Sequence, residues 1–375
     1  MSYDEYEEAM RRLVNLIIEY SPRNVRRLAH KLGLPVETVR YRIKKLLEKR
    51  RFRIHASLDY NKLGLVRHWA FLEFSKEYEG KELAVLRSLG QVGYLTYYCR
   101  TIPESILLAQ FTLPKIFEEN HQNFLEELKK IDVIKDYQLF KSKWFRHLDF
   151  KSEFYNFKNF SWDIDWGSLK NIEFKPEVFQ SEDVLSYDKK DLLILGKLQI
   201  DSFTSFIDMA KKLGIERKTL LYHYHNHIRK NKLVSKYLVR WTGDIESVQR
   251  YTIIYLKAWI KNCTKEKMEL AQRFFGSLPF TWSDSYSEKD EFYIADLAMP
   301  LAHYPDTLRY LQLNFGALAK ELRIAIIDPN FVSAYTIPHH MFIEDIGWVF
   351  EIEKLVKIFK PLVNTIHKQF YLEKN

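Results

Sequence analysis

Apolar positions in the first fifty residues recur at helical spacing in three consecutive segments. The first segment ends before Ser21-Pro22, the second is closed by Gly33, which supplies the left-handed residue that ends many helices, and the third starts at Pro35 and runs to about Arg50. The inward positions of the last two segments are Val25, Leu28, Ala29, Leu32, Val39, Ile43, Leu46 and Leu47. A short helix, a glycine turn and a longer amphipathic helix predict a helix-turn-helix, whose last helix is shaped to enter a DNA major groove.

The same pattern returns 181 residues later. Matching apolar and glycine positions are Phe206, Met209, Ala210, Leu213, Gly214, Leu220 and Ile228, and Thr219 and Tyr222 repeat Thr38 and Tyr41. Two copies in register make a chance match to a three-helix bundle improbable, so the sequence predicts a tandem duplication.

Each helical segment is followed by alternating strand and helix patterns. An extended segment over 51–57 suits a wing or hinge strand, and the order strand, helix, strand, strand, helix, strand then covers 69–140. That order is typical of a ferredoxin-like sandwich. The second copy is rougher, with strands predicted near 252–259, 281–286, 292–297 and 322–327 and helices near 265–275 and 306–318.

The predicted fold class is therefore α+β, with two tandem units of a winged helix-turn-helix and a ferredoxin-like βαββαβ module, plus a C-terminal helix. The expected domains are a winged helix-turn-helix over 1–55, an α/β module over 56–142, an aromatic-rich connecting segment over 143–185, a second winged helix-turn-helix over 186–243, a second α/β module over 244–330 and a helical tail over 331–375.

Positive charge is concentrated in the two helix-turn-helix segments. The chain carries a net charge of +9, whereas 21–53 alone has a balance of +10 and 201–240 one of +6. This distribution favours a partner rich in phosphate, and we expect sequence-selective binding of double-stranded DNA. The candidate DNA-binding residues are Arg26, Arg27, Thr38, Arg40, Tyr41, Arg42, Lys44, Lys45, Arg51, Arg217, Lys218, Thr219, Tyr222, His223 and His225. The first copy is expected to contribute more of the affinity, because Leu221 replaces Arg40 in the second.

The chain resembles the Lrp/AsnC family of transcriptional regulators. The resemblance rests on the helix-turn-helix, on the joining segment Leu58-Asp59-Tyr60-Asn61-Lys62-Leu63-Gly64-Leu65 and on the βαββαβ order, and it covers 4–142 at residue level. It implies a regulator without catalytic activity that dimerises through its sandwich, here as an internal pair of units, with further homodimerisation through the α/β modules or the C-terminal helix. Members with an effector site carry a Gly-Asp turn between the second and third strands, and this chain has Thr101-Ile102-Pro103-Glu104 and Ser287-Glu288-Lys289-Asp290 instead. A small-molecule effector is therefore left open.

Two other functions remain as alternatives. A relative of the family with paired units acts as a siroheme decarboxylase, and the residues available for such a tetrapyrrole pocket are Tyr97, Tyr98, Arg100, His303 and Tyr304. The winged helices can also serve as a scaffold that binds another protein. We expect neither, and we expect no cofactor.

Three histidines lie close together in the second helix-turn-helix. His223 and His227 share one helical face at a spacing suited to a metal ion. The repeat aligns His227 with the apolar Leu46, and no nearby carboxylate or cysteine is evident, so no metal is predicted.

The connecting segment is unusually aromatic, with twelve aromatic residues over 140–179. We expect it to pack across both units, with a base-stacking platform for single-stranded nucleic acid as the alternative. Beyond 328, an amphipathic helix over 349–359 is expected to cap the second unit, with pairing to another chain as the alternative.

Neither a membrane span nor a secretory signal is visible, and a cytoplasmic location is expected. Cys99 and Cys263 lack metal-site spacing and are expected to be free thiols in apolar surroundings.

Overall fold

The computed structural model describes residues 3–48, 52–172, 183–241 and 252–359. The first helix-turn-helix consists of α1 (Tyr3–Tyr20), α2 (Val25–Leu32) and α3 (Val36–Glu48). Asn24 caps α2 by accepting a hydrogen bond from the Arg27 N–H, and Gly33 ends the helix at φ 64°. This left-handed conformation is the one that glycine adopts without strain, as the sequence pattern requires.

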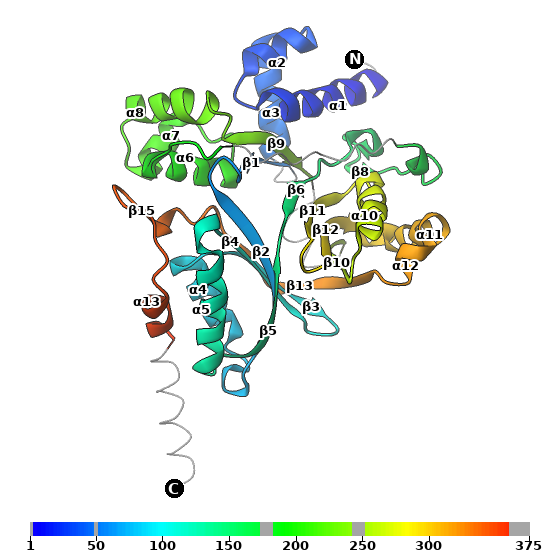
Figure 1. Cartoon of the computed structure of the whole chain (residues 1–375). Helices are drawn as coiled ribbons and strands as arrows, with labels where there is room; N and C mark the ends of the chain where they lie inside the picture. Colours follow the sequence, from blue (N-terminus) through cyan, green and yellow to red (C-terminus); the bar gives the residue numbers. More distant parts are fainter. Residues whose placement is uncertain (1–2, 49–51, 173–182, 242–251, 360–375) are drawn as a thin grey trace.

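The second helix-turn-helix repeats this arrangement in α6 (Lys189–Ile200), α7 (Phe206–Leu213) and α8 (Arg217–Tyr222), and Gly214 ends α7 at φ 64°. A π-helical segment, η5 (His223–Arg229), continues α8. Strands β1 (Arg53–Leu58) and β9 (Val234–Arg240) follow the two copies and pair with each other antiparallel. This β1–β9 ribbon joins the two helix-turn-helix modules at one end of the molecule (Figure 1).

The two α/β modules share a single sheet. The first module contributes β2 (Leu65–Phe74), β3 (Leu95–Ile102), β4 (Leu107–Pro114) and β5 (Ile134–Lys141), with α4 (Glu82–Val92) and α5 (Glu118–Lys130). The second contributes β10 (Ile253–Lys261), β11 (Thr281–Ser287), β12 (Phe292–Pro300) and β13 (Arg323–Ala334), with α10 (Lys265–Ser277), α11 (Tyr304–Asn314) and α12 (Gly316–Ala319). With β6 (Trp144–His147), the described strands form a nine-stranded sheet in the order β5-β2-β4-β3-β13-β10-β12-β11-β6. The predicted α+β fold class is confirmed.

The two edge strands of this sheet are neighbours in the chain. Only Ser142 and Lys143 separate β5 from β6, and their N–H groups donate to Arg67 O of β2 at 3.1 Å and to Tyr286 O of β11 at 2.8 Å. The sheet therefore curls until its edges meet. Its inner face encloses an apolar cluster drawn from both modules: Trp69, Cys99, Leu108, Phe140, Trp259, Phe292, Ile294 and Ile327. The helices α4 and α5 cover one outer part of the sheet, and α10, α11 and α12 lie beside the other (Figure 1).

The connecting segment packs against the first helix-turn-helix and the second module. Besides β6 it forms η3 (Ser152–Phe154), β7 (Tyr155–Asn156), β8 (Ser161–Trp162) and η4 (Leu169–Asn171). Phe150, Tyr155 and Phe157 are buried with Trp241 in the core of the first helix-turn-helix. Their rings are therefore covered by protein.

The end of the described chain crosses back to the first module. After β13 pairs with β3, the chain passes through η7 (His339–Met341), β14 (Phe342–Ile343), β15 (Gly347–Trp348) and α13 (Ile352–Lys357). Leu355, Val356 and Phe359 are buried in the core that α4 and α5 form with the first module. The expectation that this helix caps the second unit is wrong, because the β13–β3 pairing delivers the chain to the first unit. The part of the tail over 360–375 lies outside the described residues.

The remaining short helices are η1 (Lys76–Tyr78), η2 (Lys115–Phe117) and η6 (Leu301–His303). None of the described helices combines the length and apolar character needed to cross a bilayer. Cys99 and Cys263 are buried free thiols, as predicted, and burial raises the pKa of Cys99 to about 11.

Candidate anion-binding site

Two buried arginines and two partly buried histidines gather where the inner face of the sheet meets the β1–β9 ribbon. Arg67 comes from β2, His147 from β6, and His55 and Arg240 from the paired strands β1 and β9. Their mutual proximity is evident in His147, whose pKa is lowered well below its ordinary value by burial and by the charges of Arg67 and Arg240. We call Arg67, His147, His55 and Arg240 the cationic cluster.

Arg67 lies between two aromatic rings. Its guanidinium carbon is 3.9 Å from the Tyr60 ring centroid and 3.8 Å from that of Phe145. The side chain is buried, and its Nε and Nη1 atoms have no hydrogen-bond partner among the described residues. Stacking on the two rings fixes the plane of the guanidinium, and its N–H groups stay available to donate hydrogen bonds in that plane.

Arg240 is held in a similar way. Its Nη2 donates to Leu148 O at 2.7 Å and to Trp282 O at 3.1 Å, and the guanidinium lies over the rings of Phe150 and Trp282. Burial lowers its pKa to about 10, so the group remains charged at neutral pH. Its Nε and Nη1 atoms have no partner in the described part of the chain.

The two histidines of the cluster are neutral at neutral pH. Burial is the main cause that lowers the pKa of His55, although Gln199 O, 2.8 Å from its Nδ1, opposes the shift. His147 Nδ1 lies 3.0 Å from Ser57 Oγ. A neutral imidazole can donate a hydrogen bond from one ring nitrogen and accept one at the other without the cost of burying a further charge.

Among the residues that the structure describes, few acidic groups lie near Arg67 and Arg240. Asp149 pairs with Lys236 at 3.0 Å and is the acidic group that raises the pKa of Arg240 against burial. Burying an arginine with unpaired donors costs several kcal/mol unless an anion, water or other acceptor compensates it. The unsatisfied donors of Arg67 and Arg240 therefore make the cationic cluster a candidate site for an anion.

A second polar group lies further along the inner face. Trp69 is two residues from Arg67 on the same face of β2, and the Lys257 ammonium lies 3.9 Å from its ring centroid and 4.5 Å from that of Tyr97. Lys257 is fully buried and forms an ion pair with Asp296, which also accepts from Ser283 at 2.8 Å. Burial raises the pKa of Tyr97 well above its ordinary value, so its phenol keeps its proton.

The tetrapyrrole candidates chosen from sequence are not brought together. Tyr97 faces the interior, whereas Tyr98 contacts Phe331 and Tyr335 on the opposite face of β3. Arg100 pairs with Asp328 at 3.1 Å. His303 contacts Trp166, and Tyr304 packs at the core of the second module.

The candidate DNA-binding residues of the first copy lie mostly on one exposed helix. Those with exposed side chains are Arg26, Arg27, Arg40, Tyr41, Lys44 and Lys45, while Thr38 and Arg42 are half-buried. In the second copy Arg217, Lys218, Tyr222 and His225 are exposed and Thr219 is half-buried. Arg51 lies outside the described residues.

His223 does not face outward with this group. Its Nδ1 lies 2.9 Å from Asp191 Oδ1, and His227 Nδ1 lies 2.9 Å from Asp191 Oδ2. The expectation that no carboxylate lies near these histidines is wrong, because α6 brings Asp191 against the recognition helix from 32 residues away in the chain.

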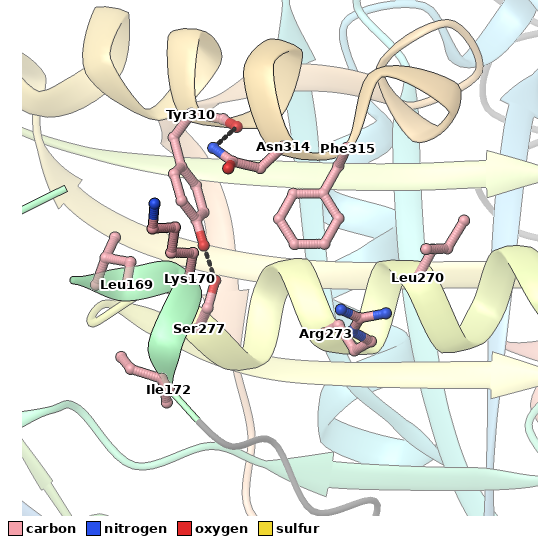
Figure 2. Close-up of a pocket in the computed structure, with 9 residues that line it drawn as sticks. All are labelled: Leu169, Lys170, Ile172, Leu270, Arg273, Ser277, Tyr310, Asn314 and Phe315. Carbon is pink, nitrogen blue, oxygen red and sulfur yellow. Dashed lines mark hydrogen bonds between the residues drawn. The ribbon is translucent and has the colours of Figure 1, made fainter. Parts of the chain in front are cut away.

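A pocket of about 370 Å³ lies on the outer side of the second module. It is bounded by η4, α10 and α11, and its lining includes Arg273, Ser277 and Tyr310, whose hydroxyl lies 3.2 Å from Ser277 Oγ (Figure 2). The helices separate it from the inner face of the sheet, so it is distinct from the cationic cluster.

Sequence reasoning missed the cationic cluster. Its signal is weak: Arg67 and His68 interrupt the apolar run of β2, and Arg240 ends the apolar alternation of β9. A charge inside a strand pattern that otherwise predicts burial points to an internal site, but the partner strands cannot be read from the sequence.

Comparison with solved structures finds a similar fold over nearly the whole chain. The siroheme decarboxylase NirDL matches with a TM-score of 0.54 and 13% identity, over 96% of this chain and 99% of that chain. NirDL in complex with an iron-uroporphyrin III analogue matches with a TM-score of 0.54 and 11% identity, over the same shares of the two chains. A transcriptional regulatory protein of the AsnC family from Pyrococcus furiosus matches over 34% of this chain and 84% of its own, with a TM-score of 0.28 and 18% identity. No family model and no curated protein sequence matches the chain.

These matches correct one expectation. The resemblance to Lrp/AsnC regulators predicts a protein without catalytic activity, but NirDL, which matches over 96% of this chain, is an enzyme. The expectation of a non-enzyme is therefore contradicted by this comparison.

Proposed function

We propose that this protein is an enzyme that decarboxylates a polycarboxylated tetrapyrrole of the siroheme class. The observation that carries the proposal is the buried cationic cluster, with unsatisfied donors on Arg67 and Arg240, inside a fold that matches a siroheme decarboxylase over its full length. A tetrapyrrole with several carboxylate side chains is an anion of the required kind, and the aromatic rings around Arg67 suit a flat macrocycle.

The reaction places defined demands on the site. The bond between a side-chain carbon and its carboxylate breaks, carbon dioxide leaves, and the electron pair that remains on carbon takes up a proton. Arg67 and Arg240 would hold carboxylates that do not react, which fixes the substrate in the site. Tyr97 is a protonated phenol on the same inner face and is the group that we assign to proton delivery.

The proposal is tested by titrating the purified protein with siroheme, and with iron-uroporphyrin III as a stable probe, while following the visible absorption of the macrocycle. We expect one tetrapyrrole per chain. Arg67→Gln should weaken binding at least about tenfold, because a hydrogen bond to a charged group contributes about 1.5–3 kcal/mol.

Arg87→Gln is the matched control, because Arg87 is exposed on α4, away from the cluster. An absorption spectrum unchanged by the protein, or equal losses in the two variants, would contradict the proposal.

Binding of double-stranded DNA is the second candidate, and the exposed basic face of α3 favours it. Arg40, Lys44 and Lys45 are exposed beside Tyr41, whose side chain is 63% exposed. A double variant Arg40→Gln with Lys44→Gln should weaken binding to duplex DNA. It should also reduce the slope of log affinity against log salt concentration by about two units, because two phosphate contacts are lost. The control is the double variant Lys81→Gln with Arg87→Gln, at two exposed residues of the first module, which removes the same amount of charge. It should leave both the affinity for duplex DNA and its salt dependence unchanged.

A further inference from the structure

Four metal-ligating side chains meet between the first and last helices of the second helix-turn-helix. Asp188 and Asp191 belong to the start of α6, and His223 and His227 belong to η5. One ligand atom from each residue lies within 4.8 Å of those of all the others. We propose that these residues form a binding site for a divalent transition-metal ion of the zinc class, which fastens the recognition helix to α6.

The geometry is close to that of a formed site. Asp191 Oδ1 lies 2.9 Å from His223 Nδ1, Asp191 Oδ2 lies 2.9 Å from His227 Nδ1, and Asp188 Oδ1 lies 3.6 Å from His223 Nδ1. Bonds of about 2.0–2.2 Å to a tetrahedral zinc ion place neighbouring ligand atoms about 3.3–3.6 Å apart. Small side-chain movements are therefore enough to admit an ion in place of the protons between Asp191 and the two imidazoles.

The local backbone explains why the donors converge. Asp188 caps α6, and its side chain and that of Asp191 each accept the other residue's N–H in a capping box, which fixes both carboxylates at the helix start. On the other side, η5 is π-helical and presents His223 and His227 with ring centroids 4.7 Å apart. Such π-helical segments often occur at functional sites.

Burial and access also suit an ion. Asp191 is fully buried and His223 nearly so, whereas the side chains of Asp188 and His227 are 33% and 31% exposed. The inner ligands are thus shielded, and the outer ones leave a route for the ion from solvent. Two imidazoles and two carboxylates match zinc or a neighbouring transition ion better than calcium or magnesium, which take oxygen ligands.

The test uses the full-length protein after removal of metal with a chelator. Zinc is added in competition with a chromophoric chelator, and cobalt is added separately because tetrahedral cobalt with nitrogen and oxygen ligands absorbs visible light. We expect one ion per chain and a cobalt spectrum of tetrahedral type. Zinc should raise the midpoint of thermal unfolding, because an ion that binds the folded state stabilises it.

His227→Gln and His223→Gln should each weaken zinc binding by more than about 100-fold, because each removes a direct ligand. Loss of a residue that only orients a ligand weakens metal binding by about 10–100-fold. His225→Gln is the matched control, because His225 is exposed on the same segment and packs on Phe206 and Tyr224. It should bind zinc like the wild type.

Far-ultraviolet circular dichroism of each variant shows that it has folded. The proposal is overturned if the wild-type protein takes up neither zinc nor cobalt, or if folded His227→Gln and His223→Gln variants bind zinc as tightly as His225→Gln. In that case Asp191, His223 and His227 only stabilise the packing of the recognition helix against α6 through their hydrogen bonds.

Discussion

Phe140 of the first module stacks on Phe292 of the second, with ring centroids 3.8 Å apart and ring planes 16° apart. Phe140 lies on edge strand β5 and Phe292 on β12, so this contact lies where the curled sheet closes. Phe71 contacts both rings edge-on. The two modules thus share one hydrophobic core on the inner face of the sheet.

Truncation of this contact tests that view. Phe292 is 1% exposed, and Phe292→Ala should lower the free energy of unfolding by about 3–5 kcal/mol, the usual cost of deleting a buried phenylalanine. Urea unfolding followed by tryptophan fluorescence measures the change. Ile116→Ala, at a residue 79% exposed, is the control and should change stability by less than about 0.5 kcal/mol. Equal stability of the two variants would show that the modules do not depend on the shared interior.

A buried ion pair attaches β6 to the second module. Arg146 donates to both carboxylate oxygens of Asp284, at 2.5 and 2.7 Å, and Tyr293 donates to the same carboxylate at 2.6 Å. Arg146→Ala should lower stability by about 3–5 kcal/mol, because it leaves the Asp284 charge buried without a cation. The double variant Arg146→Ala with Asp284→Ala should recover part of that loss, which a double-mutant cycle measures. If the double variant is less stable than Arg146→Ala alone, this electrostatic explanation is wrong.

The returning C-terminal segment depends on a close approach at Gly90. A methyl group at this position of α4 would lie 2.3 Å from the Tyr335 ring. Gly90→Ala should therefore displace Tyr335 and loosen the segment over 335–359, which increases its amide hydrogen exchange and its cleavage by protease. Gly80→Ala, where a methyl group meets nothing within 4 Å but the backbone has φ 79°, controls for a general loss of stability. Faster exchange of this segment in Gly90→Ala alone is the expected result, and unchanged exchange would contradict the proposed packing.

Stability should fall in mild acid. Burial lowers the pKa of His55, His121 and His147, and that of His339 to about 4, whereas histidine in the unfolded chain has a pKa of about 6.5. Below pH about 6.5 the unfolded chain takes up protons that the folded protein does not, so the stabilisation present above that pH is lost as the pH falls toward the folded-state values. Each such group contributes at most about 1.4 kcal/mol per pH unit.

The measurement is the urea midpoint between pH 8 and pH 5. His147→Asn should flatten the pH dependence, because asparagine can replace the contact of Nδ1 with Ser57 but does not titrate. His225→Asn, at an exposed histidine, should leave the slope as it is in the wild type. A wild-type midpoint independent of pH in this range would refute the account of the buried histidines.

Local sequence patterns predicted the helices and strands of the fold. They did not predict which distant strands pair with each other. The capping roles of Gly33 and Gly214 and the order of strands and helices were predictable, because each depends on a few neighbouring residues. The joining of two sheets into one depends on the pairing of β3 with β13 and of β6 with β11, between residues more than 100 positions apart. No periodicity within either segment records such a partner.

The candidate site shows the same division. The exposed basic helix of the first copy was predicted because its charges lie close together in sequence. Arg67, His147 and Arg240 come from three distant strands, and Asp191 lies 32 and 36 residues before the two histidines that it contacts. Apolar periodicity placed His227 on the inner face of its helix but could not show that the Asp191 carboxylate lies next to it.

The measurement that tests the central claim most directly is a single-turnover reaction of the protein with siroheme in the absence of oxygen, analysed by mass spectrometry of the tetrapyrrole. The account predicts a product lighter by the mass of carbon dioxide for each carboxyl group removed, formed by the wild type and by Arg87→Gln but much more slowly by Arg67→Gln. Siroheme recovered unchanged from the wild-type protein, although bound at one per chain, would contradict the assignment of decarboxylase activity.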